Sequence, residues 1–564
     1  MSSSKDPDSP AVLTRAPPWY AELTRYHWFV LVVAALGWMF DTMDQQLFNL
    51  ARAPAIADLR QPPPQEDLAV SKAKVAEYGG YATSIFMVGW AAGGIAFGVL
   101  GDRIGRARTM ALTIVVYSIF TGLSALSVSI WDFALYRFLT GLGVGGEFAV
   151  GVALVAEVMP DRARPRALGW LQASSAIGNM VAAVISLALG GLEQSGVIDR
   201  AWRFMFLLGV LPALLVVVIL FRLREPERWQ QTIQRAGSVQ ELGSIRELFG
   251  TRRWRHNALV GMVLAFAGVV GLWGIGFFSF DLTRAVFRKP LAQEAIDRGE
   301  GERDRNFVRL AISNPAEFGQ TARRVQPNDL LDADAVALYR SALALWRQND
   351  PVGADGVLGI LDRNGQSPAD RMRRKEILAG SSTTAELATE TDRIVKRVKS
   401  IDGRLTFWAG VTSLLLNFGA FFGVYSFSVV TQYTGRKPAF ALAFVLALVS
   451  TAFTFWFLTS HRDVFWMIPI MGFCQISLFG GYAIYFPELF PTRLRSTGTS
   501  FCYNVGRFVA AIGPLFLGLL TSKVFVGFPH EPLRYAGVTM CAFFLIGLFA
   551  LPLAPETKGQ PLPD

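Results

Sequence analysis

The chain has 564 residues, of which 52% are apolar and only 17% are charged. A mean hydropathy of +0.35 excludes a soluble enzyme of this length and predicts a multi-pass membrane protein. The net charge of +10 does not indicate a nucleic-acid partner, because the Lys and Arg residues gather in short connections between apolar runs.

Twelve apolar runs, each of about 20 residues, predict twelve transmembrane helices. They are residues 28–50, 78–100, 109–130, 132–157, 166–190, 203–221, 257–280, 405–430, 438–458, 464–487, 497–521 and 535–553. The polar tail 1–27 lacks the apolar region of a cleaved signal peptide, so the first run must act as the insertion signal.

The Arg-rich connections all follow even-numbered runs, and they therefore share one side of the membrane. The connection 223–256 is the richest in Arg, and the connection between runs 3 and 4 has no Lys or Arg. By the positive-inside rule, this side is the cytoplasm. We expect both termini, including the tail 554–564, to be cytoplasmic and the protein to lie in a bacterial inner membrane.

The first run contains two acidic residues, Asp41 and Asp44, which share one helix face. An ionisable side chain inside a span costs about 2.5–3.5 kcal/mol on insertion scales, so it usually faces a cavity or a partner. Arg137 lies at a depth comparable to that of Asp41 and could pair with it, or could serve as a substrate ligand. Glu147 is about 80° around the helix from Arg137, so the two point to different places.

The connection after the second run carries the motif Gly98-x-x-Gly101-Asp102-Arg103-x-Gly105-Arg106. Its glycines allow a tight turn and close helix approach, and its charges could hold one conformation and release another. Simple anchoring by positive charge is the alternative, which we favour for Arg103. The candidate gating residues are Gly98, Asp102, Arg103, Gly105, Arg106, Glu157, Arg164, Gly435, Arg436, Glu488 and Arg495. Glu157 and Glu488 are expected mainly to support the scaffold.

A polar segment, residues 286–403, separates the seventh run from the eighth and is predicted to lie outside the cytoplasm. Apolar residues at helical spacing in 329–348 and 370–400 predict a small helical cap, which could bind an extracytoplasmic partner. The Asp residues between them lack EF-hand spacing, so no metal is expected. The chain thus divides into a first bundle, 28–222, the connection 223–256, helix 7 at 257–285, the insert 286–403, and helices 8–12 at 404–553.

Three signatures recur in the second half at nearly constant spacing. Arg106 returns as Arg436, Glu157 as Glu488, and Pro226-Glu227 as Pro555-Glu556, at offsets of 330, 331 and 329 residues. This spacing indicates an internally duplicated chain, and duplicated membrane chains are mostly transporters. The second copy of the first motif has Gln432 in place of Asp102.

Intramembrane polar residues also occur in the second half. Arg507 lies near the predicted midplane, where a guanidinium suits a carboxylate. Gln475, Tyr482 and Asn504 could line a cavity or bridge helices.

Cysteine and histidine usage excludes several kinds of site. The three Cys residues lie in apolar runs, and the four His residues lie at run ends or in connections. Neither a disulfide framework, a thiolate metal site nor a buried histidine relay is expected, so carboxylates would have to carry any protons. We expect no cofactor and no enzymatic activity, since no nucleophile–base pair, metal spacing or phosphate loop is present.

Several motifs together resemble the major facilitator superfamily, close to its sugar-porter-like branch. They are the loop around Arg106, the run from Arg137 to Glu147, the segment Pro487–Arg495, and Pro555-Glu556-Thr557-Lys558-Gly559. The resemblance covers the chain except the insert and the first 25 residues. It implies two six-helix bundles that rock around a central cavity.

Within this branch, three features resemble symporters of organic anions. Asp41-Thr42-Met43-Asp44 resembles the Asp-Gly-x-Asp motif of aromatic acid:proton symporters, with Thr42 in place of glycine. The Gly-Gly-Glu that ends at Glu147 resembles sialate:proton symporters. Asn504-x-Gly506-Arg507 resembles a segment of the aromatic-acid group, whereas the insert matches neither group.

The sequence therefore predicts a secondary active transporter of a small organic anion and protons. Asp41, Asp44 and Glu147 are the candidate proton carriers, and two close carboxylates resist simultaneous ionisation. The candidate substrate ligands are Arg507, Arg137, Gln475, Tyr482 and Asn504. In this hypothesis, protonation of Asp41 or Asp44 and a substrate carboxylate on Arg507 neutralise the cavity before it rocks. A sugar carrier and a non-transporting sensor that uses the insert are the alternatives.

Overall fold

The computed structural model describes residues 18–60, 68–194, 197–235, 242–347, 383–510, 512–525 and 527–563. Within these ranges the chain is helical and has no strand. Eleven helical stretches of the described chain are long and apolar enough to cross a membrane, against the twelve predicted. The all-α membrane class is therefore confirmed.

The first half contains α1 (Arg25–Leu59), α2 (Leu68–Ile104), α3 (Arg106–Ser124), α4 (Ile130–Val158), α5 (Arg164–Gln194), α6 (Ala201–Leu208) and α7 (Ala213–Arg222). Helix α4 packs against α2 and α3, while α1 packs against α5. The helices α6 and α7 together form one span, which is interrupted near Pro212. Proline has no backbone N–H and so cannot donate a helical hydrogen bond.

The second half begins with α10 (Arg252–Val269), η2 (Val270–Ile275), η3 (Gly276–Phe278) and α11 (Ser279–Asp297). It continues with α17 (Thr383–Thr434), α18 (Arg436–Phe457), α19 (His461–Glu488), η5 (Thr492–Leu494), α20 (Arg495–Ser500), η6 (Phe501–Val505), α21 (Gly506–Ala510), α22 (Ile512–Leu519), η7 (Leu520–Val524), α23 (Pro532–Met540), α24 (Phe543–Ala550) and η8 (Leu551–Leu553).

The predicted run 497–521 is the one that is absent from the eleven long helical stretches. It is divided among α20, η6, α21, α22 and η7, and the π-helical turns η6 and η7 interrupt the α-helical hydrogen-bond ladder. Such turns are frequent at functional sites. The run also includes residue 511, which lies outside the described residues.

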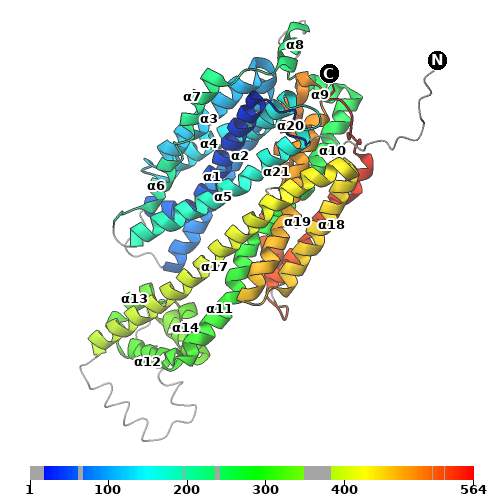
Figure 1. Cartoon of the computed structure of the whole chain (residues 1–564). Coiled ribbons are helices and arrows are strands. Elements are labelled where there is room, and N and C mark those ends of the chain that lie inside the picture. The colour runs from blue at the N-terminus through cyan, green and yellow to red at the C-terminus, as the bar shows by residue number, and fades with distance from the viewer. Residues whose placement is uncertain are drawn as a thin grey trace, which may run out of the picture.

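The molecule has two distinct ends (Figure 1). The C-terminus lies at one end with α8 (Glu227–Arg235) and α9 (Ile245–Gly250), and we call this end the terminal face. The opposite end carries α12 (Glu300–Ser313), α13 (Pro315–Arg324) and α14 (Ala333–Arg347), and we call it the insert face. Between these ends, α5 of the first half and α17 of the second half lie in contact.

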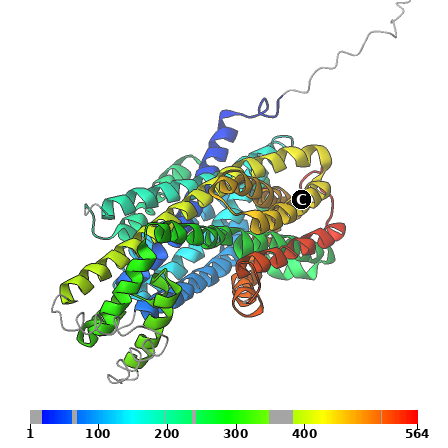
Figure 2. The same cartoon turned by 90° about the horizontal axis from the view of Figure 1, so that it is seen from below.

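The insert is built on the extended ends of two membrane helices (Figures 1 and 2). Helix α17 runs for 52 residues without a break from the insert into the membrane region. The insert has its own apolar core, which includes Phe307, Ile312, Phe318, Tyr339, Leu387 and Ile394. The expected helical periodicity is met at Ala335, Ala342, Leu387 and Ile394, whereas residues 370–382 and the Asp-containing loop 350–362 lie outside the described residues.

Helices α2 and α4 pack closely because glycines face one another. A Cβ atom on Gly93 would overlap the carbonyl oxygen of Leu142, and one on Gly145 would overlap the carbonyl oxygen of Trp90. Small residues at four-residue spacing allow such backbone contact between membrane helices. Gly141 and Gly145 of the fourth run are therefore packing residues.

Gly93→Ala is expected to destabilise the protein by about 1–3 kcal/mol, because the added methyl group meets rigid backbone rather than a movable side chain. Gly190→Ala is the matched control, since a Cβ atom there would meet nothing within 4 Å. The melting temperature of the purified protein in detergent should fall for the first variant and not for the second. Equal melting temperatures would contradict the packing argument.

Candidate functional site

A cavity lies between the two halves and contains about 620 Å³ of empty space, part of it open to solvent. Its wall consists of Trp38, Thr42, Gln45, Gln46, Asn49, Gln172, Ser175, Ala176, Asn179, Leu272, Trp273, Asn417, Ala420, Val424, Ile476, Phe479, Tyr503 and Arg507. Arg507 is the only cation in this wall, and the wall contains no carboxylate. The cavity is therefore suited to a ligand that carries a negative charge.

Arg507 is held rigidly at the edge of this cavity. Its guanidinium carbon lies 4.0 Å from the centre of the Trp90 ring and 4.2 Å from that of the Tyr503 ring. One amino group, Nη2, donates a hydrogen bond of 2.8 Å to the Tyr503 hydroxyl. The other two nitrogens, Nε and Nη1, are buried and have no hydrogen-bond partner in the described structure. Both keep N–H groups that can donate charge-assisted hydrogen bonds to a carboxylate.

The pairing of Arg137 differs from the expected one. Its Nη1 lies 3.8 Å from Asp44 Oδ2, so the partner is Asp44 rather than Asp41. Arg137 also donates to Ser124 Oγ at 2.7 Å and lies 4.7 Å from the centre of the Phe206 ring. The sequence could not decide between the two acids, because three residues shift the position along the helix by only about 4.5 Å. Arg137 is not among the cavity-lining residues.

Asp41 is left without a direct partner. It is completely buried, and neither carboxylate oxygen accepts a hydrogen bond within the described structure. It interacts electrostatically with Glu147, Asp44 and Arg507. An unpaired ionised carboxylate in such a place is costly, so Asp41 is suited to binding a proton.

Glu147 lies behind Asp41 in the interior of the first half. Its Oε2 accepts a hydrogen bond of 2.7 Å from Thr113, and its Oε1 has no hydrogen-bond partner among the described residues. A Cβ atom on Gly37, one helical turn before Asp41, would overlap Oε1, so this glycine makes room for the acid. The buried hydroxyl of Tyr117 interacts electrostatically with the same carboxylates.

The remaining substrate-ligand candidates have mixed positions. Gln475 donates to the carbonyl oxygen of Gly271 at 2.8 Å, and Tyr482 donates to that of Leu264 at 2.6 Å. Both side chains bridge helices and are absent from the cavity wall. Asn504 lines a smaller pocket together with Arg507, and it donates to the carbonyl oxygen of Gly145 at 3.3 Å.

Sequence reasoning missed several residues of the wall. Trp38, Trp273 and Tyr503 face the cavity, but an aromatic residue in an apolar run is equally typical of a lipid-facing position. Gln45 could have been found from the sequence, because it lies one helical turn after Asp41 on the same face.

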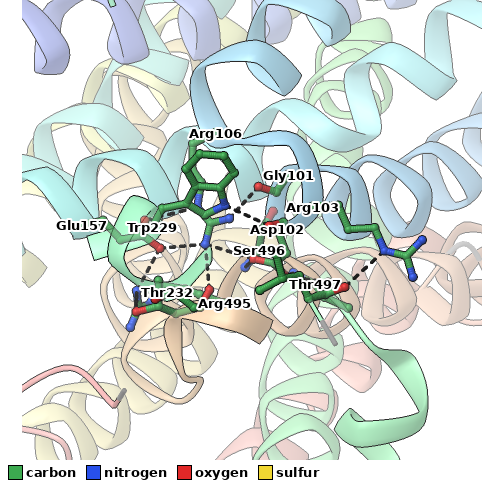
Figure 3. Close-up of polar contacts among 12 residues, drawn as sticks. Gly101, Asp102, Arg103, Arg106, Glu157, Trp229, Thr232, Arg495, Ser496 and Thr497 are labelled. Carbon is green, nitrogen blue, oxygen red and sulfur yellow. Dashed lines mark hydrogen bonds and ion pairs between the residues drawn. The ribbon is translucent and has the colours of Figure 1, made fainter. Parts of the chain in front are cut away.

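The charged motifs gather at the terminal face (Figure 3). Arg106 donates from Nε and Nη2 to the two oxygens of Glu157, at 3.2 and 2.9 Å, and from Nη1 to the carbonyl oxygen of Gly101 at 2.5 Å. Glu157 also accepts a hydrogen bond of 2.9 Å from Arg495 of the second half. One buried carboxylate thus joins two arginines from different halves.

Asp102 makes a second connection between the halves (Figure 3). Its carboxylate accepts hydrogen bonds from the backbone N–H groups of Ser496 and Thr497, at 3.2 and 2.9 Å, and from the Thr497 hydroxyl at 2.7 Å. Asp102 also lies 3.0 Å from Arg106 Nη2. The two halves are therefore held together at the terminal face by Asp102, Glu157 and their partners.

The second copy repeats this geometry within one half. Arg436 donates to both oxygens of Glu488, at 3.0 and 2.8 Å, and to the carbonyl oxygen of Thr431 at 3.2 Å. Gly105 and Gly435, with φ of 113° and 97°, precede the equivalent helices α3 and α18. The duplication predicted from the spacing is thus visible as a repeated pattern of contacts.

The third repeated signature paired Glu227 with Glu556, but the residue equivalent to Glu556 in the structure is Glu225. Glu225, rather than Glu227, accepts hydrogen bonds from the backbone N–H groups at the start of α3, including that of Arg106 at 2.7 Å. In the second half, Glu556 accepts equivalent bonds from Arg436 and Lys437, at 2.9 and 3.0 Å. The spacing between Glu225 and Glu556 is 331 residues. Burial would raise the pKa of Glu556, but its backbone N–H donors hold this pKa below the usual value.

The other gating candidates also lie at the terminal face. Arg103 donates to the carbonyl oxygen of Leu242 at 3.2 Å, so it does more than anchor the loop. Arg164 donates to the carbonyl oxygen of Ala156 at 2.8 Å and pairs with Asp161. A Cβ atom on Gly98 would lie 2.6 Å from Ser500 Cβ, so this glycine allows the halves to approach closely.

Comparisons with known proteins agree with this architecture. The family model of the Major Facilitator Superfamily matches residues 28–291. A protein of Haemophilus influenzae named as a metabolite transport protein is 24% identical over 542 residues, which cover 96% of this chain and 99% of that protein. The cis,cis-muconate transport protein of Acinetobacter baylyi is 24% identical and covers 86% of each chain. The structure of the proton:xylose symporter XylE has a TM-score of 0.56 at 16% identity and covers 95% of this chain and 98% of that chain.

Proposed function

We propose that this chain, which belongs to the major facilitator superfamily of membrane transporters, moves a small organic anion together with protons by alternating access. The observation that carries this proposal is that Nε and Nη1 of Arg507, in the cavity between the halves, have no hydrogen-bond partner among the described residues. Relatives named for muconate, niacin, sialic acid and benzoate support the choice of an organic anion. The substrate carboxylate would bind Arg507 and lie beside the aromatic rings of the wall.

The remaining architecture follows from the same proposal. The terminal face, which is rich in Arg, lies in the cytoplasm by the positive-inside rule. The segmented run 497–521 is the eleventh membrane helix and completes the set of twelve, and the insert 286–403 lies outside the cytoplasm. Both termini are then cytoplasmic, in the inner membrane of a bacterium.

Proton coupling is assigned to Asp41, because Asp44 already pairs with Arg137. An ionised Asp41 attracts Arg507 and competes with the substrate for it. Once Asp41 is protonated, Arg507 is available for the substrate carboxylate, and the loaded cavity carries less net charge. Because desolvating unpaired charge is costly, this state can close more readily than a loaded state in which Asp41 is ionised. Glu147 provides a second proton site behind Asp41.

A sugar carrier is the second candidate, and the amides of the wall favour it. Gln45, Gln46, Gln172, Asn179 and Asn417 line the cavity and could bind sugar hydroxyls. A sugar would leave the Nε and Nη1 nitrogens of Arg507 without an anionic partner, which is why we prefer the organic anion.

Asp41→Asn is expected to abolish accumulation driven by a pH gradient in proteoliposomes. The amide cannot exchange a proton, but exchange of internal for external substrate should persist. The panel consists of benzoate, niacin, sialic acid, cis,cis-muconate and glucose. Asp281→Asn, at a half-exposed ion pair with Arg284, is the control and should accumulate substrate normally.

Two outcomes would contradict the proposal. Normal accumulation by Asp41→Asn would remove Asp41 from proton coupling. Uptake of glucose but of no acid by the wild-type protein would favour the sugar carrier, and absence of all uptake would favour the sensor.

A further inference from the structure

Gln45 follows the buried acid Asp41 by one helical turn and lines the cavity. Asp41 and Gln45 are four residues apart on α1, and residues at this spacing share one face of a helix. Gln45 lines the cavity and Asp41 does not. A change at Asp41 can therefore reach a bound molecule through the Gln45 side chain.

Both groups have unused hydrogen-bonding capacity. The two Asp41 oxygens and Gln45 Nε2 are buried, and none of them has a hydrogen-bond partner among the described residues. Asp41 and Gln45 nevertheless interact electrostatically. A side-chain amide can donate from its nitrogen or accept at its oxygen, whereas an ionised carboxylate only accepts and a protonated one can also donate.

We propose that Gln45 is a positioning residue whose amide turns over when Asp41 binds a proton, and that this turn makes the cavity a better site for an anion. With Asp41 ionised, Gln45 Nε2 donates to the carboxylate, and Oε1 presents a partial negative charge to the cavity. With Asp41 protonated, its O–H donates to Gln45 Oε1, and the Nε2 hydrogens turn toward the cavity. They can then donate to a substrate oxygen.

The turn requires only the movement of one proton onto Asp41 and a rotation of one amide. It deepens the proposed function, on which it rests. Coupling between two binding sites is reciprocal. If a proton on Asp41 strengthens the binding of the anion, the bound anion must strengthen the binding of that proton by the same factor. The Gln45 amide is thus the group that couples protonation of Asp41 to binding of the anion.

The other charged and titratable groups around Asp41 cannot make this change of polarity. Glu147 on α4, Asp44 on α1 and Tyr117 on α3 do not line the cavity, and Asp44 pairs with Arg137. Arg507 and Tyr503 do line it, but a guanidinium only donates hydrogen bonds, and the Tyr503 hydroxyl already accepts one from Arg507. Gln45 is a neutral side chain of the wall, one helical turn from Asp41, and it can switch between donating and accepting a hydrogen bond.

The test is substrate counterflow in proteoliposomes at equal pH on both sides, measured at one acidic and one alkaline pH. The probe is the acid among benzoate, niacin, sialic acid and cis,cis-muconate that the wild-type protein exchanges fastest. We expect the half-saturating concentration of the wild type to fall about tenfold on acidification, within the usual range of coupling between sites. For Gln45→Leu the ratio between the two pH values should approach one.

Gln46→Leu is the matched control, because Gln46 lines the same cavity but its Oε1 faces Asn49 Nδ2 at 3.4 Å. It should keep the wild-type pH ratio, whatever its effect on affinity. Gln45→Met, which keeps the side-chain length, is the second variant if Gln45→Leu fails to fold.

The outcomes separate the two proposals. A wild-type pH ratio in a folded and active Gln45→Leu or Gln45→Met protein would overturn the role of Gln45. A wild-type protein whose affinity does not depend on pH would instead overturn the proposed proton coupling. Loss of the ratio in both Gln45→Leu and Gln46→Leu would show that the effect is not specific to Gln45, and would also overturn its role.

Discussion

Arg507→Lys is expected to lower the uptake of every carboxylate of the panel by about 100-fold, although it preserves the positive charge. The guanidinium lies between Trp90 and Tyr503, and its Nε and Nη1 have no hydrogen-bond partner among the described residues and can donate to a carboxylate. A lysine ammonium is a compact charge on a flexible stem and cannot reproduce the fixed, planar arrangement of these donors. Loss of one charge-assisted hydrogen bond costs about 1.5–3 kcal/mol, and the substitution also removes the contacts with both rings.

The measurement is the initial rate of uptake by proteoliposomes that contain equal amounts of folded transporter. Arg203→Lys is the control, because Arg203 also lies against an aromatic ring, at 4.4 Å from the centre of Trp202. Its hydrogen bonds go to the carbonyl oxygens of Ala125 and Ser127, away from the cavity. This variant should lose some thermal stability and keep its uptake. Carboxylate uptake at the wild-type rate by Arg507→Lys would refute the substrate-binding role.

The helical architecture could be predicted from the sequence because it depends on local properties. Apolar runs of sufficient length predicted the membrane helices, and the spacing of Arg106 and Arg436 predicted the duplication. The paired geometries of Arg106 with Glu157 and of Arg436 with Glu488 support that inference directly. The core of the insert was also partly predictable, because helical periodicity placed Ala335 and Leu387 on buried faces.

The site was harder to predict because it depends on how helices are rotated against each other. Asp41 and Asp44 are nearly equivalent in the sequence, but only Asp44 lies near Arg137. Gln475 and Tyr482 are polar residues in a span, and only the packing shows that they bond to backbone carbonyls of α10 and η2. Likewise, the Pro-Glu pair made Glu227 look equivalent to Glu556 in the sequence, whereas the residue that accepts hydrogen bonds from the start of α3 is Glu225.

Asp102→Asn is expected to open the terminal face, because Asp102 joins the two halves there. Its carboxylate accepts three hydrogen bonds from Ser496 and Thr497 of the second half. The amide of the Asn variant has only one oxygen that can accept hydrogen bonds, and it lacks the negative charge of the carboxylate. The cost of about 1.5–3 kcal/mol for a hydrogen bond to a charged group corresponds to a shift of about 10- to 150-fold toward the open state.

Glu225→Gln separates this effect from a simple loss of stability. Glu225 also accepts backbone hydrogen bonds at a helix start, but its partners, Arg106, Ala107 and Arg108, belong to its own half. Both variants should therefore melt at lower temperature, and only Asp102→Asn should change the balance between conformations. The second half has Gln432 at the position equivalent to Asp102, so it has no second acid of this kind.

The conformational balance can be measured by alkylation of a cysteine introduced at Ala176 in the cavity wall. A membrane-impermeant reagent added from the terminal face should label this cysteine faster in Asp102→Asn than in the parent protein. The native residues Cys474, Cys502 and Cys541 are buried, and a parent without the introduced cysteine measures their background. Equal labelling of the Asp102→Asn and Glu225→Gln proteins would mean that Asp102 stabilises the fold without holding the halves together. Faster labelling of Asp102→Asn alone would identify its bonds to Ser496 and Thr497 as the contacts that must break before the cavity opens toward the terminal face.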